Sequence, residues 1–206
     1  PLVVEKVDDS WCDADMVKGH PTLILQLAKI NGDIDKYPSI SEYVKNPTKQ
    51  FDEMTAHYGE DLLEHQKKWL FNSMIYGGGH QGWVDALTDP PDKDLQRGYI
   101  ATPLLTQKPR PFEVQFKKEC DMIKEVVYKN NPALIELLKG ENKNKKYFKE
   151  KGIDTNDDDA TGKVDKTKPE ETTSIPLHKM KNKVISYFLQ ILENECLYHL
   201  YEYLVK

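Results

Sequence analysis

The stretch from Leu62 to Gly79, with the sequence LLEHQKKWLFNSMIYGGG, constrains the fold of this 206-residue chain more than any other. Its apolar spacing predicts one helix over residues 61–76. Three glycines follow, and glycine ends a helix readily because it enters the left-handed region without strain. The large apolar side chains share one side, which we expect to face a core: Leu63, Leu70, Phe71 and Met74.

The opposite side of this predicted helix carries polar groups at intervals of four residues. Lys68, Asn72 and Tyr76 fall on one stripe at 100° per residue. The stripe has two interpretations. Either it is a solvated surface on which Glu64 pairs with Lys68, or it presents a cation, an amide and a phenol to a ligand.

The composition indicates a soluble protein, with 38% hydrophobic and 31% charged residues. No apolar run approaches the ~20 residues that a membrane span needs. The three cysteines, Cys12, Cys120 and Cys196, have neither the spacing of a zinc site nor that of a disulfide framework. This suits a reducing compartment. The chain starts at Pro1 and ends in apolar residues, without a signal peptide, so we expect a fragment of a longer protein that is not secreted.

The N-terminal segment predicts two short strands, at residues 1–7 and 11–16, followed by a helix that opens at His20-Pro21-Thr22. Asp13 and Asp15 share one face of the second strand. An acidic strand end that leads into a helix is a common place for a catalytic carboxylate. The alternative is that Asp15 is an ordinary helix cap and His20 a surface histidine.

The rest of the chain predicts mainly helices. We expect short helices from residue 39 to 58, a proline-rich connection at 88–111, an amphipathic helix at 112–128 and a polar, flexible insertion at 141–176. A long helix at 177–204 carries Gln190, Glu193 and Asn194 within an apolar run. The net charge of −5 counts mildly against nucleic-acid binding, although much of the acid lies in the insertion.

The pattern Lys68-x-x-x-Asn72-x-x-x-Tyr76-Gly77 resembles the fingers-helix motif of family A DNA polymerases and single-subunit phage-type RNA polymerases. In that superfamily the lysine grips the triphosphate of the incoming nucleotide and the tyrosine closes over the nascent base pair. The family usually has an arginine four residues before the lysine. This chain has Glu64 there, with Lys67 nearby as a further cation.

Two other segments are similar to motifs of the same superfamily, in the same order. DADMVKGHP resembles the first palm motif, in which an aspartate holds two Mg²⁺ ions. The resemblance implies Asp15 as that ligand, with Asp13 as the alternative, and His20 as the residue that shapes the sugar pocket. YFLQILEN looks like the palm helix that contacts the primer-template. It implies nucleic-acid contacts at Gln190, Glu193, Asn194 and Lys183.

Together these resemblances imply an α+β, predominantly helical fold: a right-hand polymerase palm and fingers fragment with a short N-terminal β element. Residues 1–30 and 177–206 are predicted to belong to the palm and residues 31–140 to the fingers. The implied catalytic residues are Asp15, Lys68 and Tyr76.

The implied function is a DNA polymerase-like nucleotidyltransferase that adds nucleotides to a primer 3′ end. The implied cofactor is Mg²⁺, with one carboxylate ligand missing from these residues. The partners are a nucleoside triphosphate and primer-template nucleic acid, with no membrane. The expected location is the cytoplasm, or wherever the genome is replicated.

Two alternatives come from other functional classes. A non-catalytic helical interaction module is favoured by the net acidity, the helical content and the missing arginine. A metal-dependent nuclease is the other alternative, built around Asp13, Asp15 and His20 with His57 or His80.

Overall fold

The computed structural model describes residues 2–6, 12–16, 19–59, 62–88, 108–140 and 175–205. For residues 2–6, 12–16 and 204–205 it describes the backbone alone. The predicted insertion at 141–176 therefore lies outside the described residues, except for its last two. Most of the proline-rich connection at 88–111 lies outside them as well.

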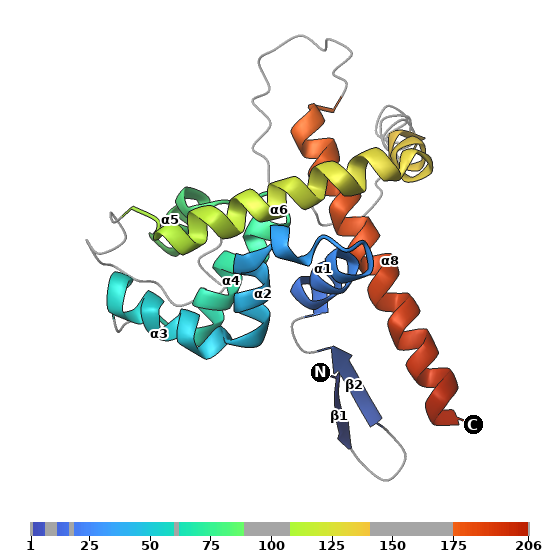
Figure 1. The fold of residues 1–206 in the computed structure, drawn as a ribbon, viewed down its shortest axis with the longest axis horizontal. Coiled ribbons are helices and arrows are strands. Elements are labelled where there is room, and N and C mark those ends of the chain that lie inside the picture. Colours follow the sequence, from blue (N-terminus) through green and yellow to red (C-terminus); the bar gives the residue numbers. More distant parts are fainter. Residues whose placement is uncertain are drawn as a thin grey trace, which may run out of the picture.

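Two strands and a series of helices follow one another along the chain (Figure 1). The strands β1 (Leu2–Lys6) and β2 (Cys12–Met16) pair in antiparallel register, with Val3 opposite Asp15 and Glu5 opposite Asp13. The helices are α1 (Gly19–Ile30), the 3₁₀ turn η1 (Ile34–Lys36), α2 (Pro38–Lys45), α3 (Pro47–Tyr58), α4 (Glu64–Ile75), α5 (His80–Thr88), α6 (Pro111–Asn130), a helical segment at 132–140, and α8 (Leu177–Val205).

Helix α6 is the central element, and it packs against α2, α4 and α8. Figure 1 shows it lying across the molecule, with α8 crossing it. Its buried side chains recur at helical spacing: Phe116, Cys120, Ile123 and Val127. Pro111 starts the helix, where a missing N–H costs nothing because the first helical donors have no partner within the helix.

Three aromatic rings join α2, α4 and α6 in the core. The ring centroids of Tyr43 and Phe71 lie 4.3 Å apart, and those of Phe71 and Phe116 lie 5.0 Å apart. Tyr43 also meets Phe116 edge-to-face at 5.5 Å. Each such pair contributes about 0.5–1.5 kcal/mol beyond its buried area, so this trio fixes how the three helices are rotated against one another.

Two fully buried carboxylates of α6 fix its neighbours. Glu119 accepts hydrogen bonds from the backbone N–H groups of Ser39 (3.1 Å) and Ile40 (2.9 Å) in the first turn of α2. That turn is where a helix has unpaired donors and a positive dipole end. Glu113 accepts from the Tyr58 hydroxyl at the end of α3 and, at 2.8 Å, from Nε of Arg110. Burial and the charge of Glu113 raise the pKa of Tyr58.

The predicted α+β fold class, a polymerase palm and fingers fragment with a β element, is wrong. The described part is predominantly helical, and its buried core comes from helices and their connections between Leu23 and Leu189. Among the described residues there is no sheet beyond the β1–β2 pair. A palm needs a broader sheet covered by helices, because two strands bury too little surface to form a layer of their own.

The predicted helix at 61–76 also differs in its first turn. The helix begins at Glu64, with Leu63 as the capping residue before it. Leu63 is 51% exposed, so it does not belong to the apolar side on which the sequence placed it. Leu70, Phe71 and Met74 are buried as predicted. No described helix is long and apolar enough to cross a membrane.

Replacing the buried carboxylate of α6 tests how the core is joined. We expect Glu119→Gln to lower the free energy of unfolding by about 2 kcal/mol, because the two backbone donors of α2 lose their charged acceptor. Glu136→Gln in the 132–140 segment is the control. Glu136 is 73% exposed and pairs with Lys139 on the surface, so its effect stays below about 0.5 kcal/mol. Urea denaturation measures the free energy of unfolding of both variants. Equal losses in Glu119→Gln and Glu136→Gln would contradict the role of Glu119.

Candidate functional site

Three residues singled out by the sequence meet in one hydrogen-bonded cluster. The Tyr76 hydroxyl bonds Nδ1 of His20, and Nε2 of His20 lies 3.1 Å from Oε2 of Glu193. The rings of His20 and Tyr76 meet edge-on, with centroids 5.5 Å apart. These residues come from α1, the end of α4 and α8. We call Tyr76, His20 and Glu193 the tyrosine–histidine–glutamate cluster.

The order of donors in this cluster follows from its chemistry. An ionised carboxylate only accepts hydrogen bonds, so Nε2 of His20 carries the proton that faces Glu193. In the neutral imidazole Nδ1 is then the acceptor, and the Tyr76 hydroxyl donates to it. The chain of bonds runs from phenol to imidazole to carboxylate, and it fixes the orientation of the Tyr76 ring. His20 and Glu193 are 20% and 28% exposed, so solvent reaches the cluster.

Helix α4 ends where it touches α8. Gly77 has a φ of 96°, a left-handed conformation that suits glycine. A Cβ atom at this position would lie 2.1 Å from the Asn182 side-chain nitrogen. The Asn182 amide oxygen accepts from Nζ of Lys124 at 3.3 Å. Sequence reasoning named Gly77 but missed Asn182 and Lys124, because no local pattern links residues on three helices.

Asn182 and Glu193 lie on nearly the same face of α8, because eleven residues correspond to about three helical turns. Along the axis they are about 16 Å apart. The Tyr76 and His20 side chains bridge from the end of α4, beside Asn182, to Glu193. Gln190 lies about one turn before Glu193, whereas Asn194 is the next residue and points about 100° away from it; both are exposed.

The sequence predicted that the polar stripe of α4 points away from the core; this holds for Lys68 and Asn72, whereas Tyr76 packs against the core. Lys68 and Asn72 are exposed and Tyr76 is half-buried. Nζ of Lys68 lies 2.8 Å from Oε1 of Glu64, with both side chains more than half exposed. This is the Glu64–Lys68 pair expected if the stripe is a solvated surface.

Lys67, the further predicted cation, is held elsewhere. It is buried, and its ammonium donates to the Thr55 hydroxyl on α3. The structure therefore does not bring Lys67 to the tyrosine–histidine–glutamate cluster. Lys183 on α8 is half-buried.

The predicted metal ligands lie on β2: Asp13 is five residues before Lys18, and Asp15 is five residues before His20. The side chains of both aspartates lie outside the described residues. The five peptide units between Asp15 and His20 span at most about 18 Å. Among the described side chains, no group of three or more His, Cys, Asp and Glu residues is arranged to hold a metal ion.

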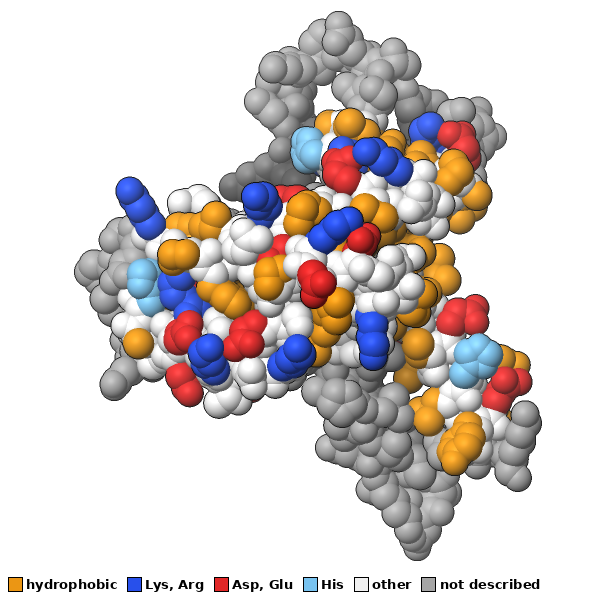
Figure 2. Space-filling model, viewed as in Figure 1, with side chains coloured by type: hydrophobic (Ala, Val, Ile, Leu, Met, Phe, Trp, Pro, Cys, Tyr) orange, Lys and Arg blue, Asp and Glu red, His pale blue; other side chains and the backbone are white. Residues whose placement is uncertain are grey.

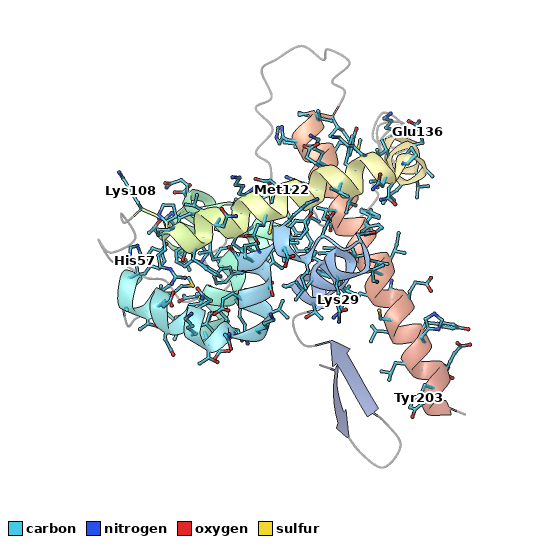
Figure 3. The ribbon with its side chains drawn as sticks, in the orientation of Figure 1. Lys29, His57, Lys108, Met122, Glu136 and Tyr203 are labelled. Carbon is cyan, nitrogen blue, oxygen red and sulfur yellow. The ribbon has the colours of Figure 1, made fainter. Side chains whose placement is uncertain are left out.

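The histidines of the nuclease hypothesis are engaged in different places. His57 lies on α3 and bonds the carbonyl of Lys108 at 3.0 Å; both are labelled in Figure 3. His80 stacks on Tyr58, and burial lowers its pKa. His20 instead contacts Tyr76 and Glu193. The described contacts of these histidines therefore do not join them into one metal site.

The surface in Figure 2 carries Lys and Arg side chains interspersed with acidic and hydrophobic ones. Cations of the described residues are often paired, as Lys117 is with Asp121 at 2.6 Å. This face therefore carries no continuous basic patch for a phosphate backbone.

Comparison with known proteins gives no match: no family model fits the sequence, and no curated protein or solved structure is detectably similar to it.

The junction of α4 and α8 is open to a direct test. We expect Gly77→Ala to lower the free energy of unfolding by about 2 kcal/mol, from left-handed strain and displacement of the Asn182 amide. Gly79→Ala is the matched control, since a Cβ there meets no atom within 4 Å. Chemical denaturation compares the two. Gly77→Ala as mild as Gly79→Ala would mean that the two helices do not meet closely at this point.

Proposed function

We propose that this chain is part of a template-directed nucleotidyltransferase that adds nucleotides to a primer 3′ end. One observation carries the proposal. Tyr76, His20 and Glu193 come from the three segments that resemble polymerase motifs, and they meet although 56 and 173 residues separate them in sequence. A chance match of short motifs gives no reason for these residues to be in contact. The contact of these residues does not require a palm fold.

The stripe of α4 supports a role for Lys68 with the triphosphate. Lys68 lies on the same face as Tyr76, two helical turns away, so a ligand beside the Tyr76 ring also lies along this stripe. Its pair with Glu64 is exposed on both sides, and such pairs are worth only about 0–1 kcal/mol. A triphosphate carries more charge than one carboxylate and therefore replaces Glu64 as the partner of Lys68.

The reaction needs no covalent protein intermediate. The primer 3′-hydroxyl oxygen forms a bond to the α-phosphorus, the bond from that phosphorus to the bridging oxygen breaks, and pyrophosphate leaves. The hydroxyl proton passes to solvent. Asp15, with Asp13 as the alternative, would hold Mg²⁺, since carboxylate oxygens are the ligands this ion takes. An ion held there would supply charge that stabilises the entering and leaving oxygens.

The tyrosine–histidine–glutamate cluster has a positioning role in this proposal. Tyr76 presents its ring to the base pair being formed, and the bond to His20 restricts that ring. Glu193 in turn holds His20 in the tautomer that accepts from the phenol. A ring held in one orientation loses less conformational entropy when a base stacks on it.

A second function has an observation of its own. The last three turns of α8 carry exposed aromatic side chains, with Tyr198, Tyr201 and Tyr203 each more than half exposed; Figure 3 shows Tyr203 near the end of this helix, away from its crossing with α6. Such a surface favours a non-catalytic helical interaction module. In that case the Lys68–Glu64 pair is an ordinary surface pair.

Triphosphate binding distinguishes the two functions. We expect the chain to bind a fluorescent deoxynucleoside triphosphate with Mg²⁺, and Lys68→Ala to weaken that binding about tenfold, which corresponds to ~1.4 kcal/mol for one lost charged contact. Fluorescence anisotropy measures the dissociation constant.

Lys139→Ala is the matched control for this measurement. Lys139 is 51% exposed and pairs with Glu136 at 2.7 Å, whereas Lys68 is 52% exposed and pairs with Glu64 at 2.8 Å. The two variants thus remove the same charge and the same kind of ion pair. Equal effects of both, or absence of triphosphate binding by the unmodified chain, would exclude the nucleotidyltransferase and leave the interaction module.

A further inference from the structure

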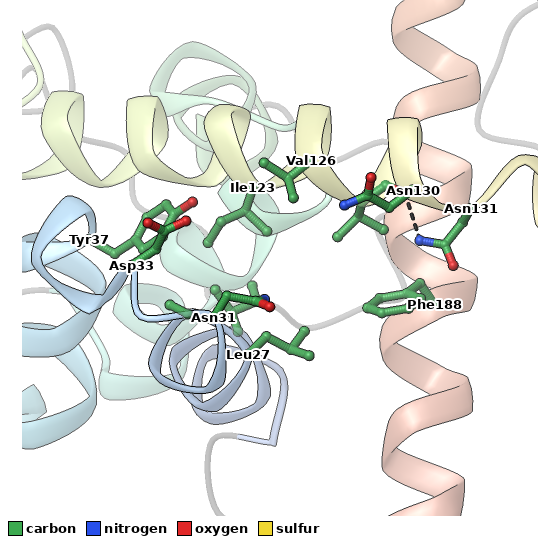
Figure 4. A pocket seen from close by; sticks show the side chains of 12 residues that line it. Leu27, Asn31, Asp33, Tyr37, Ile123, Val126, Asn130, Asn131 and Phe188 are labelled. Carbon is green, nitrogen blue, oxygen red and sulfur yellow. Dashed lines mark hydrogen bonds between the residues drawn. The ribbon is translucent and has the colours of Figure 1, made fainter.

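A cavity of about 330 Å³ lies between α1, α6 and α8, on parts of these helices that the nucleotidyltransferase proposal does not use. This volume is in the range of small-molecule sites. Figure 4 shows its two ends. Asp33 and Tyr37 lie at one end, and Asn130, Asn131 and Phe188 lie at the other. Between them lies the polar side chain of Asn31, and the rest of the wall is aliphatic: Ile24, Leu27, Ala28, Ile123, Val126 and Val127.

The acidic end selects for a cation. None of the twelve lining residues is a lysine or arginine, and Asp33 is the one charged residue among them. Lys36, outside the cavity, lies 2.7 Å from Oδ1 of Asp33 and is itself mostly exposed. A ligand ammonium would share the Asp33 carboxylate with Lys36, and the Lys36–Asp33 pair is a weak surface pair that it can replace. Burial raises the pKa of Tyr37, so its phenol stays neutral beside the carboxylate.

The other end suits an aromatic ring. Phe188 from α8 lies there beside the side chains of α6 (Figure 4), and rings of two partners stack or meet edge-on favourably. Nδ2 of Asn131 donates to the Val127 carbonyl at 2.7 Å, which leaves its amide oxygen as an acceptor. The cavity thus combines a negative end, an aliphatic wall and an aromatic end.

We propose that this cavity binds a small arylalkylamine, with the ammonium at Asp33 and the aromatic ring at Phe188. The ligand lies across the aliphatic wall between α1 and α6. Its site is separate from the tyrosine–histidine–glutamate cluster, although α1 and α8 contribute to both.

Phenethylamine is the probe, and 3-phenylpropionate is its counterpart of similar shape and opposite charge. Ligand-observed NMR and isothermal titration calorimetry on the whole chain should give a dissociation constant on the order of 0.1–1 mM for the amine, as fits a fragment of this size. The carboxylate should bind at least tenfold more weakly. Equal binding of the two probes, or no binding of the amine, overturns the proposal.

Three variants locate the bound amine. Asp33→Asn should weaken amine binding about tenfold, whereas Asp35→Asn, an exposed aspartate of η1 outside the cavity lining, should leave it unchanged. Val126→Trp should abolish binding by filling the cavity, and Val126 is 46% exposed, so the larger side chain does not disrupt the core. Circular dichroism melting checks that each variant is folded. Unchanged binding in Val126→Trp, or equal losses in the two aspartate variants, overturns the proposal.

Discussion

The contact between the end of α4 and α8 is the constraint on which the candidate site depends. Gly77 can approach the Asn182 side chain because it has no Cβ, and its left-handed backbone turns the chain away from α4 at that point. The approach places Tyr76, the preceding residue, between α1 and α8. Its hydroxyl bonds His20 of α1, and His20 in turn contacts Glu193 of α8. The atoms nearest to a Cβ at position 77 all belong to the Asn182 side chain, so a larger residue there would displace that amide from Lys124.

Buried carboxylates on α6 provide the framework around this contact. Glu113 and Glu119 are both fully buried, and each is satisfied by donors from another part of the chain. A buried carboxylate is tolerated only when its acceptors are paired, because the cost of removing it from water is large. Each therefore favours one docking geometry: Glu119 for α2, and Glu113 for the end of α3. The aromatic trio then fills the space between these fixed helices.

Helix α8 has two parts with different environments. Its first half buries Met180, Val184, Ile185 and Leu189 against the core. From Asn194 to Tyr203 its large apolar side chains are half-buried or exposed, and Tyr203 is 79% exposed. The tyrosine–histidine–glutamate cluster lies at the boundary between the two parts. A nucleic acid or a protein that bound the exposed half would therefore act next to the candidate site, which links the two proposed functions through one helix.

The amino-acid sequence predicted where the helices lie and which sides of α4 and α6 face the core. It could do so because an apolar stripe repeats locally every three to four residues. Leu70, Phe71 and Met74 of α4, and Phe116, Ile123 and Val127 of α6, follow that rule. The same local reading also gave the exposed Lys68–Glu64 pair as one of its alternatives. It placed Leu63 wrongly, because a residue one position before a helix no longer follows the helical period.

Only the tertiary structure decided the fold class and the partners of the polar groups. The order of short motifs suggested a palm, but a sheet depends on pairing between distant strands, and among the described residues β1 and β2 pair only with each other. The sequence likewise gave no sign of the contacts that Asn182 makes with Gly77 and Lys124, or of those that Glu119 makes with α2. Each of these contacts joins residues 55 or more positions apart. The meeting of Tyr76, His20 and Glu193 was decided in the same way. Sequence spacing limits which side chains share a helix face, whereas packing between helices decides which faces meet.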